Sequence, residues 1–182
     1  MADDLAFAAA FLDEARRSFR GYKRLADGAL AQVDDRGFFH VPDPESNSIA
    51  ILVKHISGNL RSRWTDFLTT DGEKPDRNRD TEFEIYEQDA KRLTDYWQRA
   101  YSVLFATMDS LTEDDLLKTV TIRQEPHTVI QAIQRQIAHY GYHIGQIVGL
   151  AKQIKGSDWK TLSIPRGKSE EYLHGKFVPP KG

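Results

Sequence analysis

Four long stretches of the chain carry apolar residues at three- and four-residue spacing, and this periodicity constrains the fold more than any other feature. Each stretch can form an amphipathic α-helix whose apolar stripe packs against its neighbours. The stretches lie at residues 4–26, 46–69, 80–109 and 126–155. The sequence therefore predicts an all-α protein built as a four-helix bundle.

Local signals mark the expected ends of these helices. Asn47 or Ser48 suits the N-cap of the second helix, and the run Thr-Glu-Phe-Glu at 81–84 resembles a capping box opening the third. Pro126 suits the first turn of the fourth helix, which we expect to stop before Gly156.

The connections differ in length and composition. Residues 27–47 are long for a link in a compact domain, so we expect them to cross the bundle end and let the first two helices run parallel. Residues 117–123 alternate enough to form an extended segment or one arm of a small hairpin. From residue 157 onward the composition predicts an irregular C-terminal tail draped on the bundle. We expect residues 1–182 to form a single domain.

Composition excludes several classes of partner. Hydrophobic residues make up 40% of the chain, charged residues 29%, and the net charge is only −2, which favours a globular protein that binds no nucleic acid. No apolar run approaches the roughly 20 residues that span a bilayer, so we expect no membrane association. The absence of cysteine excludes disulfides and thiolate ligands. Together with an acidic start that lacks an export signal, it predicts a cytoplasmic location.

Two histidines on the fourth predicted helix suggest a metal site. His139 and His143 are four residues apart, a spacing that stacks both imidazoles on one helix face. His55, beside the apolar stripe of the second helix, is well placed as a third ligand, and three neutral imidazoles leave a position open for water or substrate. The alternative is coincidence, because such pairs arise by chance in a chain with six histidines.

Nearby amides could support the three rings. Asn59, Gln136 and Gln146 lie on the same helix edges as the histidines and are candidate hydrogen-bond partners for them. Neutral nitrogen ligands suit zinc, nickel, copper and ferrous iron. We expect zinc or nickel first and iron next. The His-Glu-x-x-His motif and the repeated Glu-x-x-His pairs of di-iron bundles are absent. No catalytic residue is assigned.

The same residues resemble the DinB/YfiT-like metal-binding four-helix bundles. The motif His-x-x-x-His-x-Gly-Gln at 139–146, with His55 on the second helix, carries the resemblance. Residues 53–64 and 163–171 are similar to a branch of that superfamily of unknown function. The resemblance covers nearly the whole chain. It implies an up-down-down-up bundle with a long crossover loop, a divalent metal ion on the three histidines, and often a homodimer.

The resemblance also implies a chemistry. Characterised members of that superfamily include thiol-dependent S-transferases and a thiol-dependent isomerase, in which the metal activates a low-molecular-weight thiol. The leading hypothesis is therefore a metal-dependent thiol S-transferase that acts on a small electrophile. The alternative is a non-catalytic metal-binding or dimerising module with a structural or stress-response role. Nothing in the sequence identifies the thiol or the electrophile.

Overall fold

The predicted helical class is confirmed in the part of the chain that the computed structural model describes, residues 2–85 and 88–174. The long helices are α1 (Ala2–Leu30), α3 (Ile49–Trp64), α4 (Ala90–Ser110) and α5 (Val129–Lys155). Short helices and 3₁₀ turns are α2 (Asp35–Phe38), η1 (Asp80–Phe83), η2 (Glu113–Asp115), η3 (Gly156–Asp158) and α6 (Ser169–Leu173). A two-stranded sheet, β1 (Thr119–Ile122) and β2 (Glu125–Thr128), adds a feature that an all-α protein lacks.

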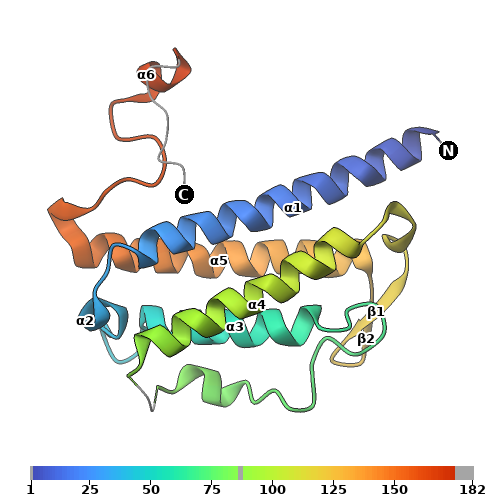
Figure 1. The fold of residues 1–182 in the computed structure, drawn as a ribbon, viewed down its shortest axis with the longest axis horizontal. Coiled ribbons are helices and arrows are strands. Elements are labelled where there is room, and N and C mark those ends of the chain that lie inside the picture. The colour runs from blue at the N-terminus through green and yellow to red at the C-terminus, as the bar shows by residue number, and fades with distance from the viewer. Residues whose placement is uncertain (1, 86–87, 175–182) are drawn as a thin grey trace.

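The long helices pack in pairs. α1 lies along α5 and α3 lies along α4, while α3 also contacts α5. The colours of Figure 1 show that the chain runs through α1 and α5 in one direction and through α3 and α4 in the other. The contact between α3 and α5 joins the two helices that carry the histidines singled out in the sequence.

The long crossover is not where the sequence suggested. Residues 31–48, which include α2, join α1 and α3, and these helices run in opposite directions in Figure 1. The prediction that this connection joins a parallel pair is therefore wrong. The parallel neighbours are α3 and α4, joined by residues 65–89. Because α3 is about 24 Å long at 1.5 Å per residue, the chain must return along its whole length before α4 begins.

Helix starts depend on capping and on tertiary contacts. Ser48 caps α3 by accepting a hydrogen bond from the Ile51 amide at 3.2 Å, as predicted. The third long helix begins at Ala90 after the N-cap Asp89, so the prediction of a helix from residue 80 is wrong. Residues 80–83 form only a 3₁₀ turn, because the Glu82 side chain turns inward to the bundle and the backbone is extended after it. Residues 86–87 of that prediction lie outside the described residues.

The hairpin displaces the predicted start of the last long helix. Pro126 lies in β2, opposite Thr121 of β1, rather than in a helical first turn. Proline is tolerated there because β2 is an edge strand. The helix α5 begins instead after Thr128, whose side chain accepts a hydrogen bond from the Gln131 amide in a capping box. The expected hairpin arm at residues 117–123 is confirmed, and so is the end of the helix before Gly156.

The tail begins on the bundle and then leaves it. Gln32 forms two hydrogen bonds with the backbone of Lys160, at 3.0 and 2.8 Å. Further along, α6 stands away from the long helices in Figure 1 and has no buried residue. The prediction of an irregular tail draped on the bundle is therefore confirmed near Lys160 and is wrong for α6, and the rest of the tail lies outside the described residues.

The core lies between the long helices and is rich in aromatic side chains. Phe19 of α1 meets Trp64 of α3 edge-on, with ring centroids 5.5 Å apart. The Trp64 indole donates to the Tyr140 hydroxyl at 3.0 Å, and this hydroxyl donates to the Asn59 carbonyl oxygen at 2.9 Å.

None of the helices in residues 2–85 and 88–174 combines the length and apolar character needed to cross a bilayer.

We predict that Tyr140→Phe lowers the free energy of unfolding by about 1–3 kcal/mol, since it leaves the Trp64 N–H and the Asn59 carbonyl buried without a partner. Tyr142→Phe is the matched control, because Tyr142 is 65% exposed and its change should stay within about 0.5 kcal/mol. Urea unfolding followed by circular dichroism measures both. Equal stability of the two variants would contradict the role of this hydroxyl.

Candidate metal centre

Three imidazoles meet where α3 and α5 face each other. His55 projects from α3, and His139 and His143 project from successive turns of α5. The Nε2 atoms of His55 and His139 are 3.4 Å apart, and one ring nitrogen from each histidine lies within 4.8 Å of the others. Within the described residues, this is the group of histidine and acidic side chains whose geometry suits one metal ion.

The other described histidines lie apart from this cluster. His127 is in β2, where its Nδ1 donates to the backbone carbonyl of Glu125 at 3.0 Å. His40 follows α2 and His174 follows α6, and both are exposed. The structure therefore brings together the three histidines that the sequence pattern selected, and the remaining three are elsewhere.

Burial keeps two of the imidazoles neutral. Desolvation, with smaller contributions from His143 and His55, lowers the pKa of His139 from 6.5 to about 3. Desolvation and the nearby His55 likewise lower the pKa of His143. A neutral imidazole with a free lone pair is the form that binds a metal ion. The imidazoles of His139 and His143 are therefore in the neutral form at neutral pH, the form that can bind a metal ion.

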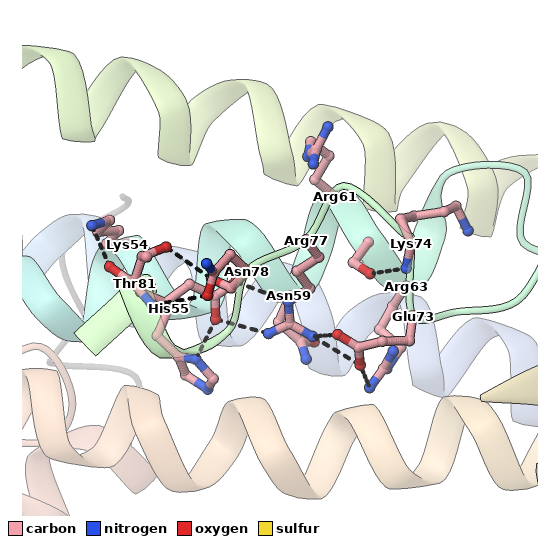
Figure 2. Close-up of polar contacts among 12 residues, drawn as sticks. Lys54, His55, Asn59, Arg61, Arg63, Glu73, Lys74, Arg77, Asn78 and Thr81 are labelled. Carbon is pink, nitrogen blue, oxygen red and sulfur yellow. Dashed lines mark hydrogen bonds and ion pairs between the residues drawn. The ribbon is translucent and has the colours of Figure 1, made fainter. Parts of the chain in front are cut away.

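A buried carboxylate fixes the third imidazole. The Nδ1 atom of His55 lies 2.8 Å from Oε2 of Glu82, and both side chains are less than a tenth exposed. A carboxylate in this position accepts a hydrogen bond from Nδ1–H and leaves Nε2 as the nitrogen with the free lone pair. In Figure 2 the His55 ring points from α3 toward α5, where the other two histidines lie. The free Nε2 thus faces the cluster.

Glu82 is held in turn by Arg77. The guanidinium donates from Nε to one carboxylate oxygen and from Nη2 to the other, each at 2.8 Å. Burial alone would raise the pKa of Glu82, but the hydrogen bonds from His55 and Arg77 outweigh it and lower that pKa. Glu82 therefore stays ionised, which is the state that accepts a hydrogen bond from His55 most strongly.

Gly58 makes room for this carboxylate. A Cβ atom at residue 58 would lie 2.1 Å from Oε1 of Glu82, so no side chain fits there without moving Glu82. Sequence reasoning missed both residues. Glu82 was assigned to a capping box, and no local pattern places a carboxylate of an irregular connection against a histidine 27 residues earlier.

The predicted supporting amides have different surroundings. The Gln146 carbonyl oxygen lies 3.4 Å from Nδ1 of His143, as expected of a partner for that ring. Asn59 accepts its hydrogen bond from Tyr140 instead. Gln136 is buried, and its carbonyl oxygen has no hydrogen-bond partner, nor has Nδ1 of His139 one turn along the same helix. A supporting role for Asn59 and Gln136 stays a prediction.

The donor set fits a transition-metal ion. Two nitrogens bound to one zinc ion at about 2.0–2.1 Å in tetrahedral geometry lie about 3.3–3.4 Å apart. The observed separation of the His55 and His139 Nε2 atoms is 3.4 Å. The carboxylate on the far nitrogen of His55 is the outer partner that metal-binding histidines usually have. Without an ion, two neutral imidazoles could also share a hydrogen bond at this distance.

Fold and site together define a helical protein with a candidate three-histidine metal centre between two of its helices. A family model described as "Protein of unknown function (DUF1572)" matches residues 6–168, and the chain belongs to this family. A comparison with curated proteins found no match.

We predict that the metal-free protein loses stability as the pH falls from 7.5 to 5, and that His139→Gln loses less. The unfolded chain takes up a proton at residue 139 below its ordinary pKa of 6.5, whereas the folded protein does so only near 3. This contribution is therefore complete above 6.5 and is lost on acidification toward 3. Urea unfolding with a chelator present measures it, with His40→Gln controlling for removal of a histidine outside the cluster.

Proposed function

We propose that the protein binds one divalent transition-metal ion through His55, His139 and His143. The observation that carries the proposal is the convergence of three ring nitrogens within 4.8 Å, one of them on a histidine anchored by a buried carboxylate. Zinc and nickel are the ions we propose first, with iron next, because neutral imidazoles suit all three. Three protein ligands leave at least one coordination position for water or substrate.

Each residue has a separate task in this proposal. His139 and His143 offer neutral nitrogens from one rigid helix, with pKa values lowered by burial. Glu82 orients His55 and places a carboxylate behind that ring. Gln146 supports His143 from the same helix. The donor set of the protein is therefore neutral, with one carboxylate directly behind it.

We predict that purified protein carries close to one metal ion per chain and that the double variant His139→Ala, His143→Ala carries almost none, because a single remaining imidazole binds weakly. Elemental analysis after metal loading and dialysis measures this. The matched control, His40→Ala with His127→Ala, removes two imidazoles outside the cluster and should keep the ion. Equal metal content in wild type and the first double variant would exclude the site.

We further propose that the centre serves a thiol S-transferase reaction, with a low-molecular-weight thiol and a small electrophile as partners. Support comes from the resemblance to DinB-like proteins, from the open coordination position that three ligands leave, and from helix directions in Figure 1 that agree with an up-down-down-up bundle. A divalent ion held by three neutral imidazoles would lower the pKa of a small thiol bound to it, so that the thiol would lose its proton near neutral pH. The homodimer implied by the same resemblance stays a prediction.

We predict that the metal-loaded protein accelerates conjugation of at least one small thiol to a chromogenic electrophile, and that a chelator and the double variant His139→Ala, His143→Ala both abolish the acceleration. Absorbance change with several thiols in turn measures it. If the protein holds its metal but no thiol is consumed faster than in buffer, the transferase proposal fails. A non-catalytic metal-binding or structural role would then be the function that the site supports.

A further inference from the structure

Residues 71–84, in the connection between α3 and α4, are referred to below as the crossover segment. Within it the residues Gly72 and Glu82 and the side chain of Arg77 are buried, and the other residues are half-buried or exposed. The crossover segment thus contributes no fully buried apolar side chain to the core. Segments with so little buried apolar surface have low local stability unless polar contacts hold them.

Polar contacts hold both ends of the crossover segment. At its start, the Asp71 carboxylate accepts hydrogen bonds from the backbone amides of Arg123 and Gln124 in the hairpin turn, at 2.9 and 2.7 Å. At its end, Lys54 of α3 donates to the carbonyl oxygens of Thr81 and Glu84, at 2.5 and 2.7 Å.

Between these ends, charges alternate along a row that Figure 2 shows in part. Arg63 of α3 contacts Glu73 at 3.1 Å, and Arg77 contacts Glu73 at 3.2 Å. Arg77 then holds both oxygens of Glu82, which ends the row at His55. The side chains of Arg63, Arg77 and Glu82 are less than a tenth exposed, so solvent screens these pairs weakly.

The crossover segment contacts the His55 ring through two side chains. Glu82 holds its Nδ1 atom, and the Phe83 ring lies against the imidazole, with centroids 4.7 Å apart. The position of the crossover segment and the orientation of the His55 ring are therefore set by the same contacts.

We propose that metal binding at the three histidines and the ordering of the crossover segment are coupled through Glu82, with Arg77 as the positioning residue. The inference rests on the proposed metal site. An ion on Nε2 fixes the His55 ring and so fixes the two side chains that touch it. Thermodynamic linkage makes the effect reciprocal, so an ordered crossover segment raises metal affinity by the factor by which metal favours its ordering.

Hydrogen exchange of the full-length protein, with and without zinc, tests the coupling directly. Zinc should slow amide exchange in residues 73–84 by about 5- to 150-fold, the usual range for coupled sites. It should change exchange much less in α1 near Arg16, whose side chain binds the carbonyl oxygens of Met108 and Leu111 at the end of α4. Zinc titration against a competing chelator gives the affinity of each variant.

Gly58→Ala tests the position of Glu82 without removing any charged side chain of the row. The new methyl would meet Oε1 of Glu82 at 2.1 Å and must displace it, although alanine favours a helix more than glycine does. Zinc affinity should fall about 10- to 100-fold, as when an outer partner of a ligand is lost. Gly149→Ala is the matched control, because no atom lies within 4 Å of its added Cβ. Its zinc affinity should equal that of the wild type.

Arg77→Gln tests the positioning residue, and Arg77→Lys tests rescue by charge. Lysine keeps the charge but not the two-pronged contact with Glu82, so it should recover only part of the affinity. Arg61→Gln is the control, since Arg61 binds the same segment at Asp76 without touching Glu82.

Nitrogen-15 spectra of the metal-free protein give a readout that a change in stability alone would not move. The His55 proton should sit on Nδ1 in the wild type and be shared between both nitrogens in Arg77→Gln and Gly58→Ala.

The outcomes separate this inference from the proposed function. If wild-type protein binds zinc at the histidines but residues 73–84 exchange at the same rate, the coupling is wrong and the metal site stands. Wild-type zinc affinity in both Gly58→Ala and Arg77→Gln would remove the positioning role. If folded wild-type protein binds neither zinc nor nickel, the proposed function fails and the coupling fails with it. Should Arg77→Gln not fold, Gly58→Ala decides alone.

Discussion

The placement of one carboxylate, Glu82, governs the architecture around the candidate site. A buried ionised carboxylate is costly unless its oxygens are paired, and here His55 and Arg77 pair them at 2.8 Å. Meeting that requirement explains features that otherwise look unrelated. Glycine stands at residue 58 on α3 because a side chain would collide with the carboxylate. The run 80–83 stays a 3₁₀ turn because Glu82 points inward.

The three proposed ligands differ in how their geometry is maintained. His139 and His143 belong to one helix, so their spacing follows from the helical repeat and needs no tertiary support. His55 comes from another helix, and its ring has a second nitrogen that must be kept away from the cluster. The charged row ends at Glu82, which binds this histidine. The charged contacts thus support the proposed ligand whose ring orientation the backbone determines least.

What the sequence could predict is what depends on local periodicity. Apolar spacing located the long helices, and the four-residue step between His139 and His143 identified the pair, with His55 selected by its place beside a helical stripe. Tertiary contacts overrode the rest. Burial of Glu82 prevents a helix from starting at the capping pattern of residues 81–84. Pro126 lies in an edge strand, where a residue without an amide proton is tolerated. No periodicity in an irregular connection reports which helix it will touch.

Asp71 and Glu82 attach one stretch of chain at two fixed points, the hairpin turn and His55. The number of residues between Asp71 and Glu82 is therefore fixed by the structure, unlike the length of a loop that is attached at neither end. Adding or deleting a residue there would shift Glu82 off His55, whereas the tail around α6, which buries nothing, can change length without disturbing the site. Homologous chains should accordingly vary in length in the tail and keep the distance from Asp71 to Glu82.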